Sequence, residues 1–552
     1  MPMVRTTGAK ALLDALLGEG IDTIFGLPGG QLDHFFDAMY AAGPRVRYIG
    51  ARHEQGAAYM AFGYARSTGR PAVYAVVPGP GVLNTTAALC SAYACNAPVL
   101  CLTGQVDSAL IGRGFGELHE IPDQLGILER LTKWAARIDT PRQASSLVAQ
   151  AFVELRSGRP RPVALEMAQD IMGLEAEVPA AHVAGTVAQP AVDLDAVMRA
   201  AGLIAAARFP MIHVGGGAVG AAAEVLALAE LLKAPVVSFR SGRGIVSDEH
   251  PLGLTLPAGH RLWPQVDVVI GIGSRMIEPL RHWGTDANLR TVRIEIDPVE
   301  LTRLGAPGVG LLGDARETLQ ALIAALETRV PRRAAIPQSV SSAKAALAAE
   351  FELVQPQLAY LKAIRAALPS NGIFCDEITQ CGFASWYAFP VYRPRQHINC
   401  GYQGTLGYGY ATALGVKVAH PDEPVVSIAG DGGLMFTIQE LATAVQHGIG
   451  LKTVVFNSNS FTNVQRQQRE WFGNRIIGSD LRNPDFCRLA EAFGAAAYRV
   501  RSPTELGATL ERALGEPGPA LIEVPVGDMA SPWQHIVMPR VRGAAARPGA
   551  AT

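Results

Sequence analysis

Two short polar segments, each at the end of an apolar run, contain the residue types best suited to chemistry. The first follows VVSIA and consists of Gly430, Asp431, Gly432 and Gly433. The second follows TVVF and consists of Asn457, Ser458, Asn459 and Ser460. Glycines between a strand and a helix, here expected to begin near Thr437, offer backbone N–H groups to a phosphate. Asp431 and oxygen ligands from residues 457–460 can hold a hard cation. The segments therefore predict a site for Mg²⁺ and a diphosphate.

The spacing of these segments resembles a known cofactor-binding motif. Asn457 follows Asp431 by 26 positions in a strand–helix–strand context. This arrangement resembles the thiamine diphosphate motif of the pyruvate oxidase and acetolactate synthase superfamily. Three N-terminal segments continue the likeness in order, namely residues 52–58 (RHEQGAA), 78–84 (PGPGVLN) and 102–106 (LTGQV). The resemblance covers roughly residues 6–539 and implies an enzyme that uses thiamine diphosphate and Mg²⁺.

The resemblance implies roles for two residues at the pyrimidine end of the cofactor. Glu54 would be the activating glutamate, whose carboxyl group touches N1′ of the ring and lets the 4′-amino group remove the proton from C2. Leu406, in residues 404–407 (GTLG), matches the bulky residue on which the cofactor folds. Taken alone, Glu54 would be a surface helix carboxylate and Leu406 a core leucine.

The resemblance also implies the residues at the diphosphate end. Residues 377–380 (EITQ) are similar to the family's other phosphate-side loop, in which Thr379 and Gln380 would touch the phosphates. Gly430, Gly432 and Gly433 would contribute the glycine turn. The metal ligands implied are Asp431, Ser458 and the backbone carbonyl of Ser460.

Two positions depart from the family pattern. In residues 115–124 (FGELHEIPDQ), His119 takes the place of a glutamine that commonly lies at the substrate end of acetolactate synthases. We expect His119 to face the substrate and to change the acceptor, although a core histidine is the alternative. Ser458 stands where the family usually has Asn or Asp. Because a hydroxyl is a weaker ligand, we expect Mg²⁺ to bind less tightly or to recruit Asn459.

The resemblance indicates an acetolactate synthase-like lyase or transferase that cleaves or forms a carbon–carbon bond next to a carbonyl. The reaction favoured is decarboxylation of a small 2-oxo acid with carboligation. A plain 2-oxo acid decarboxylase, a benzaldehyde lyase-like enzyme and a cyclic diketone hydrolase-like enzyme remain alternatives. A non-catalytic paralogue is a further one, which Glu54 argues against and which Ser458 and His119 favour.

Short apolar runs alternate with stretches of helical period along most of the chain, which predicts an α/β protein with parallel sheets covered by helices on both faces. Two irregular stretches, residues 172–193 and 330–342, interrupt the alternation. They divide the chain into three doubly wound domains. These are a pyrimidine-binding domain (residues 1–172), a central Rossmann-like domain (193–330) and a diphosphate-binding domain (343–540). The Ala- and Gly-rich end, residues 543–552, is expected to fray.

The central domain contains a second glycine signature. Residues 215–220 (GGGAVG) follow the strand PMIHV and precede a helix, as a dinucleotide site requires. The next strand ends in Arg240 and Ser241, without an acidic residue for the ribose, which argues against an NAD dehydrogenase. Close packing of the helix on the strand explains the glycines equally well. Residues 273–276 and 293–298 are similar to FAD-contacting regions of the family, so FAD remains open.

The composition limits the partners. The 552 residues include 48 Lys or Arg and 49 Asp or Glu, so the formal charge of −1 supplies no field for nucleic acid or an acidic membrane. No apolar run approaches the ~18 residues of a membrane span, and the first apolar stretch is broken by acidic residues, unlike a signal peptide. The seven cysteines include no CxxC pair. Cys90, Cys95 and Cys101 are expected in the core. These features predict a cytoplasmic protein.

The resemblance implies a homo-oligomer. In the family, the pyrimidine-binding domain of one subunit faces the diphosphate-binding domain of another. We therefore expect a dimer or homotetramer with sites between subunits, and no complete site in a monomer.

Overall fold

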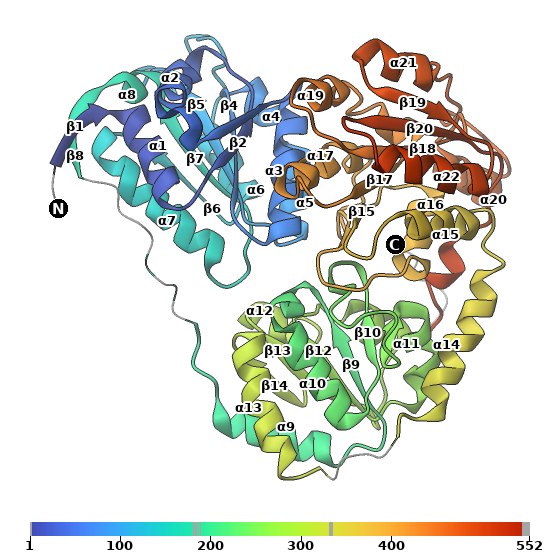
Figure 1. Cartoon of the computed structure of the whole chain (residues 1–552). Helices are drawn as coiled ribbons and strands as arrows, with labels where there is room; N and C mark the ends of the chain where they lie inside the picture. Colours follow the sequence, from blue (N-terminus) through green and yellow to red (C-terminus); the bar gives the residue numbers. More distant parts are fainter. Residues whose placement is uncertain (1–2, 180–184, 186, 188, 331–334, 544–552) are drawn as a thin grey trace. The chain divides into compact units, whose positions relative to one another are not determined.

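The computed structural model describes residues 3–179, 185, 187, 189–330 and 335–543, and these contain three six-stranded sheets (Figure 1). The first has the order β3 (Arg47–Gly50), β2 (Thr23–Gly26), β4 (Ala72–Val76), β5 (Val99–Gln105), β7 (Val163–Ala168), β6 (Trp134–Ile138). The second has the order β11 (Gly253–Thr255), β10 (Val236–Ser238), β9 (Pro210–Val214), β12 (Val268–Ile272), β13 (Arg290–Glu295), β14 (Val309–Leu312). The third has the order β16 (His397–Ile398), β15 (Ile373–Cys375), β17 (Val425–Gly430), β18 (Lys452–Asn457), β20 (Ala520–Pro525), β19 (Ala496–Arg499).

All strand pairs of the first two sheets run parallel, as do the pairs formed by β15, β17, β18, β20 and β19 in the third. Parallel strands need a crossover connection, and the intervening helices supply it. The prediction of an α/β chain with three doubly wound parallel-sheet domains is confirmed.

The first sheet buries both of its faces. In the fully buried strand β4, Val73 and Ala75 belong to one hydrophobic cluster, and Tyr74 and Val76 to another, because successive side chains point to opposite faces. The helices on the two faces are α1 (Gly8–Gly18) and α7 (Ala144–Arg156) on one, and α3 (Glu54–Thr68) and α5 (Thr86–Ala94) on the other. Helices α2 (Asp33–Ala42), α4 (Pro80–Asn84) and α6 (Gln124–Leu131) complete this region.

The central sheet follows the same plan. Met211 of β9 packs into a cluster with helices on one face, whereas Ile212 and Val214 pack into a cluster on the other. These helices are α11 (Leu256–Leu262) and α14 (Gln338–Phe351) on the first face, and α9 (Leu194–Ala205), α10 (Ala222–Leu232) and α13 (Ala315–Glu327) on the second. The short helix α12 (Pro298–Thr302) follows β13.

The glycine run before α10 lies against the backbone that follows β12. A Cβ atom on Gly215 would overlap the carbonyl oxygen of Gly273, and one on Gly217 would lie 2.8 Å from the Gly273 Cα. Only glycine permits this approach. Close packing, the alternative to nucleotide binding, therefore accounts for these two glycines.

The third sheet is accompanied by α17 (Gly409–Ala419), α18 (Asp431–Leu434), α19 (Glu440–Gln446), α20 (Thr462–Trp471), α21 (Phe486–Phe493) and α22 (Pro503–Leu514). The helix expected to begin near Thr437 begins three residues later, and a short helix that was not expected precedes it. Helix α18 begins directly at Asp431, residues 435–439 form turns, and α19 begins only at Glu440. Helices α15 (Gln357–Ala367) and α16 (Gln380–Ala388) lie on either side of β15 in the sequence.

The two stretches expected to be irregular contain regular structure at their ends. The first includes the end of α8 (Gln169–Gly173) and a strand, β8 (Glu175–Pro179), which pairs antiparallel with β1 (Met3–Thr7). In the second, α14 begins at Gln338, directly after Pro337, and residues 331–334 lie outside the described part. Of the end expected to fray, residues 544–552 also lie outside it. Cys95 and Cys101 are buried, but Cys90 is only half-buried.

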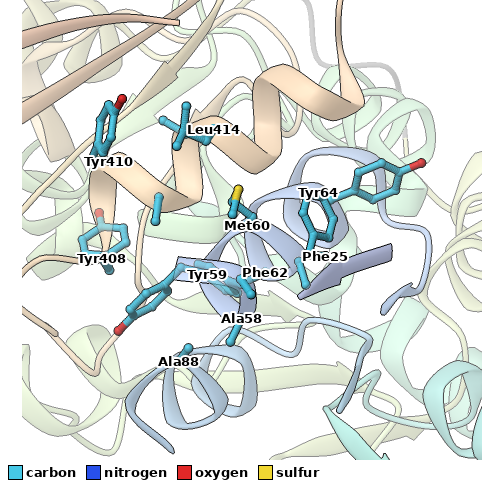
Figure 2. Close-up of a cluster of buried hydrophobic side chains, with 14 of the residues drawn as sticks. Phe25, Ala58, Tyr59, Met60, Phe62, Tyr64, Ala88, Tyr408, Tyr410 and Leu414 are labelled. Atoms are coloured by element: carbon cyan, nitrogen blue, oxygen red, sulfur yellow. The ribbon is translucent and has the colours of Figure 1, made fainter. Parts of the chain in front are cut away.

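Helix α3 of the first sheet and helix α17 of the third pack directly on each other. The first and third sheets share one compact unit, and the central sheet belongs to a second. Figure 2 shows side chains of both helices, among them Met60 and Leu414, in one buried cluster. A Cβ atom on Gly63 would overlap the backbone of Thr412, and one on Gly415 that of Met60. The two helix backbones are therefore as close as glycine allows.

We predict that Gly415→Ala destabilises this unit. Because the added methyl group meets backbone, overpacking should cost about 1–3 kcal/mol and lower the melting temperature by roughly 2–10 °C. The control is Gly202→Ala in α9, where a Cβ atom meets nothing within 4 Å, and it should leave the melting temperature unchanged or raise it slightly. Equal melting temperatures for Gly415→Ala and the parent would contradict the close contact.

Candidate functional site

The glycine turn after β17 brings four of the predicted site residues together. A Cβ atom on Gly430 would lie 3.2 Å from Cγ2 of Thr379, and one on Gly433 would lie 3.4 Å from Cδ1 of Leu406. Gly432 faces the ring of Phe461, which a Cβ atom would overlap. The turn is therefore enclosed by Thr379, Leu406 and Phe461. Its N–H groups lie at the start of α18, at the carboxyl end of a parallel strand, where α/β proteins bind ligands.

Asp431 is the charged group of this turn. It is 3% exposed, and its Oδ2 accepts hydrogen bonds from the backbone N–H of Ser460 (3.2 Å) and from Nδ2 of Asn483 (2.7 Å). Burial raises the pKa of Asp431, and the hydrogen bonds from Asn483 and the backbone oppose that rise. A buried carboxylate of this kind is a natural ligand for a cation that offsets its desolvation.

Ser458 and Ser460 lie on the adjacent turn, after β18. The Ser458 hydroxyl lies 2.7 Å from the Thr462 Oγ1 and 3.2 Å from the Ser460 carbonyl oxygen, to which it donates. Ser460 contacts Asp431 through its backbone N–H. The structure thus joins Ser460 to Asp431, while the described hydrogen bonds of Ser458 go to Ser460 and Thr462.

Asn483 was missed by the sequence reasoning. Its Nδ2 lies 2.7 Å from Asp431 Oδ2, 3.0 Å from Asn457 Oδ1 and 3.3 Å from Asn459 Oδ1. Two backbone hydrogen bonds attach the segment before Asn483 to the site. The Phe461 N–H donates to the Ser479 carbonyl, and the Leu481 N–H donates to the Asn459 carbonyl. No local sequence pattern predicts this contact. The oxygens of Asp431, Asn457 and Asn459 therefore surround one position. The Asn483 amide nitrogen occupies that position, which would also suit a cation.

Glu377 is a second residue to which the sequence assigned no role. It is 1% exposed and accepts hydrogen bonds from the backbone N–H groups of Ile378 (2.9 Å), Gly407 (3.2 Å) and Gly409 (2.7 Å). Desolvation raises its pKa to about 7, against the lowering effect of these hydrogen bonds. Glu377 thereby holds the loop that contains Leu406.

Gln380 is the first residue of α16 and is 5% exposed. Its Oε1 is buried without a hydrogen-bond partner among the residues that the structure describes. A buried amide oxygen of this kind normally has a donor.

Glu54 is the first residue of α3, and its side chain is 17% exposed. Asn84, the last residue of α4, donates a hydrogen bond from Nδ2 to its Oε2 at 2.9 Å, and His53 Nδ1 lies 3.9 Å from the same oxygen. A carboxylate at a helix N-terminus is stabilised by the helix dipole. Asn84 belongs to the PGPGVLN segment but had no assigned role.

His119 lies in the loop between β5 and α6 and is half-buried. Its backbone has a positive φ of 68°, and its Nδ1 lies 3.0 Å from Gln31 Oε1. Gln31 also donates to the Leu118 carbonyl at 3.0 Å. In the described part of the chain, no hydrogen bond joins Glu54 or His119 to the glycine turn, so the two groups of predicted residues form separate halves.

Comparisons with known proteins show which family the chain resembles. Residues 6–127 match the thiamine pyrophosphate enzyme N-terminal TPP binding domain, residues 197–322 the central domain, and residues 377–524 the C-terminal TPP binding domain. The chain is 33% identical to a probable 2-ketoarginine decarboxylase of Pseudomonas aeruginosa, over 95% of this chain and 94% of that protein. It is 32% identical to a probable acetolactate synthase large subunit of Methanocaldococcus jannaschii, over 94% and 91% of the two chains. It is 30% identical to the acetolactate synthase isozyme 1 large subunit of Escherichia coli, over 94% of each.

We predict that Asn483→Leu makes the protein depend on Mg²⁺ for stability. Loss of a hydrogen bond to a charged group costs about 1.5–3 kcal/mol, so the melting temperature without Mg²⁺ should fall by roughly 3–10 °C. A cation supplies the missing positive partner, and excess Mg²⁺ should restore most of the loss. The control, Asn288→Leu at an exposed position, should show no such difference. A loss that is the same with and without Mg²⁺ would mean that Asn483 does not occupy a cation position.

Proposed function

We propose a reaction for this chain, which belongs to the thiamine pyrophosphate enzyme family. The enzyme decarboxylates a 2-oxo acid, and the carbon that loses carbon dioxide then either takes up a proton or forms a bond to a second carbonyl compound. The observation that carries this proposal is the buried Asp431 in the glycine turn that follows β17. This turn has the form of a metal–diphosphate anchor, and the Glu54 carboxylate at the start of α3 supplies the second half of such a site.

The glycine turn and its neighbours fit the diphosphate of the cofactor. Gly430, Gly432 and Gly433 would offer backbone N–H groups, and Thr379, whose Cγ2 lies beside Gly430, would contact the phosphates. Gln380 follows Thr379 directly, and its amide N–H groups would donate to the phosphates, while its Oε1 has no partner among the described residues. Leu406, in the loop that Glu377 holds by hydrogen bonds, would support the folded cofactor. When bound, thiamine diphosphate supplies the electron sink for decarboxylation.

The ligands of Mg²⁺ would be Asp431, Ser458 and the backbone carbonyl of Ser460. Ser460 lies beside Asp431, because its backbone N–H donates to the Asp431 carboxylate. The Ser458 hydroxyl, which donates to the Ser460 carbonyl and lies 2.7 Å from Thr462 Oγ1, would ligate the metal through a lone pair of its oxygen. The amide oxygens of Asn457 and Asn459, which accept from the same Asn483 amide nitrogen as Asp431, would be additional ligands. Oxygen ligands of this kind suit Mg²⁺.

Glu54 would hold and move a proton at N1′ of the cofactor ring. The Asn84 amide donates to only one of its carboxyl oxygens, which leaves the other for the ring. His119, fixed by Gln31, would donate a hydrogen bond to the substrate carbonyl or to the acceptor. The roles of both residues rest on the family resemblance and on these contacts.

The substrate is proposed as a class, a 2-oxo acid. The names of the relatives include both decarboxylation of 2-ketoarginine and synthesis of acetolactate. We therefore propose decarboxylation as the common step and leave the acceptor to experiment.

The decisive experiment measures carbon dioxide release from pyruvate and from 2-ketoarginine, with and without an added aldehyde. Release that requires both thiamine diphosphate and Mg²⁺ is expected. Release without an acceptor indicates a decarboxylase, and a condensation product indicates a synthase. Cleavage of a hydroxyketone or a cyclic diketone without carbon dioxide would instead favour the lyase-like or hydrolase-like alternative. Cofactor binding without turnover of any of these compounds would indicate the non-catalytic paralogue and contradict the proposal.

FAD binding by the central domain stays a prediction. The packing of Gly215 and Gly217 against Gly273 is required with or without a nucleotide. Arg293, within the second FAD-like segment, donates to the carbonyls of Glu300, Leu301 and Ser274, so its guanidinium is already engaged. Flavin fluorescence of the purified and then denatured protein measures whether the cofactor is present.

The oligomeric state and the cellular location of the chain are proposed as well. We propose a dimer or homotetramer with sites between subunits, because Glu54 and the glycine turn share no hydrogen bond within the described chain. Sedimentation analysis measures this state. None of the described helices is both long and apolar enough to cross a bilayer. All seven cysteines are free thiols, which fits the proposed reducing cytoplasm.

We predict that Glu54→Gln lowers turnover by roughly 100-fold or more, the usual scale for loss of a general acid–base group, with little change in cofactor affinity. Carbon dioxide release and titration with thiamine diphosphate measure the two effects. The matched control is Glu317→Gln, at an exposed position in the first turn of α13, which should retain parental turnover. Near-parental turnover of Glu54→Gln would remove Glu54 from its assigned role.

We predict that His119→Gln changes the preference among carbonyl acceptors more than it changes decarboxylation without an acceptor. Glutamine restores the family's usual residue and removes a group that can donate a proton. The ratio of condensation product to free aldehyde, measured for several acceptors, reports the change. His34→Gln, at an exposed position on α2, is the control. If both reactions keep parental rates and ratios, His119 serves only to hold its loop through Gln31.

A further inference from the structure

Helix α19 of the third sheet binds the segment that leads into Glu54. Its side chains face the backbone of residues 50–53. Six hydrogen bonds join residues 50–53 to α19 and to His447, the residue that follows it. Gly50 N donates to His447 Nε2 (3.1 Å), and Thr443 Oγ1 donates to the Gly50 carbonyl (3.3 Å). Arg52 N donates to both Glu440 carboxyl oxygens (3.2 and 3.1 Å), His53 N donates to Glu440 Oε1 (3.0 Å), and an Arg52 guanidinium nitrogen donates to Gln446 Oε1 (2.6 Å).

Glu440 is the central residue of this contact. It is fully buried, and its carboxylate also accepts a hydrogen bond from the Thr443 hydroxyl at 2.6 Å. Burial raises its pKa, and the hydrogen bonds from Thr443, Arg52 and His53 oppose that rise. A buried carboxylate with this many donors is held in one geometry, because hydrogen bonds to a charged group are stronger than those between neutral groups.

The first turn of α3 lies directly on Glu440. A Cβ atom on Gly56 would overlap the Glu440 carboxylate, so only glycine allows the approach. The His53 side chain caps the helix by accepting from the Gln55 N–H at 3.1 Å. With the N–H groups of Arg52 and His53 bound to Glu440, the backbone on the N-terminal side of Glu54 is fixed.

We propose that Glu440 is a positioning residue for Glu54, setting where the Glu54 carboxylate meets the cofactor ring by holding the backbone of Arg52 and His53. This inference rests on the proposed role of Glu54. Glu440 makes no described hydrogen bond to the Glu54 side chain, so it is not a catalytic residue. A displacement of the reacting group by about 1 Å can cost ~100-fold in rate. The hydrogen bonds of Glu440 and Thr443 to residues 50–53, here called the α19 clamp, prevent such a displacement.

The test measures activation of the cofactor without substrate. The rate at which the C2 proton of bound thiamine diphosphate exchanges with deuterium reports how well Glu54 acts. In Glu440→Gln, one acceptor oxygen becomes a donor that faces a backbone N–H. We expect exchange to slow by roughly 10- to 100-fold, with cofactor affinity within about 3-fold of the parent. Backbone amide exchange at residues 52 and 53 should accelerate in the cofactor-free protein.

Two further variants make the result specific. Thr443→Val removes one hydroxyl from the clamp and should give a smaller slowing of C2 exchange, which keeps the test valid if Glu440→Gln folds poorly. Glu491→Gln, exposed on α21, is the matched control and should exchange at the parental rate. A parental C2 exchange rate in both clamp variants overturns the inference. So does a slowing that is matched by an equal loss of cofactor affinity, because that indicates a general structural defect.

Glu54→Gln separates this inference from the function on which it rests. If Glu54→Gln leaves C2 exchange at the parental rate, the proposed role of Glu54 fails. If Glu54→Gln abolishes exchange while both clamp variants keep the parental rate, the function stands and only the positioning role of Glu440 fails.

Discussion

The backbone contact between α3 and α17 is the constraint on which the candidate site depends. Gly63 and Gly415 let each helix approach the backbone of the other, and a side chain at either position would overlap a carbonyl group. Interiors are close-packed, so two helices in such contact have little freedom to shift. Glu54 is the first residue of α3 and therefore takes its location from this contact. The α19 clamp adds a second attachment at the N-terminal end of the same helix.

The carboxyl ends of parallel strands explain which parts of the site could be predicted. Gly430 of β17 pairs with Phe456 of β18, so the residues that follow the two strands must be neighbours. This register brings Asp431 close to Ser460, as the motif spacing indicated. Alternating apolar runs and helical stretches likewise predicted the three sheets, because buried parallel strands are continuous hydrophobic runs.

The rest could not be predicted, because it depends on long-range contacts. Asn483 reaches Asp431 through backbone hydrogen bonds between two irregular segments, which leave no periodic signal. Glu440 reads as an ordinary helix residue, and its burial follows only from the placement of α19 against residues 50–53. The break at residues 435–439 was missed for the same reason. There, the segment must turn so that Asp431 and Glu440 can each meet a different partner.

The candidate site has one anchored part and one adjustable part. Asp431 is held by Ser460 and Asn483, and Glu440 by Arg52 and His53, so both ends of the α18–α19 segment are anchored. The loop before His119 is different. Three glycines with positive φ, at positions 112, 114 and 116, shape it, and it is exposed. Glu120 holds it from within, by accepting the N–H groups of Gly114, Gly116 and Glu117, and Gln31 holds its end by donating to the Leu118 carbonyl. In the part of the chain that the structure describes, no hydrogen bond joins this loop to the α18–α19 segment, so under the proposed function the substrate contacts of the loop can vary independently of cofactor activation.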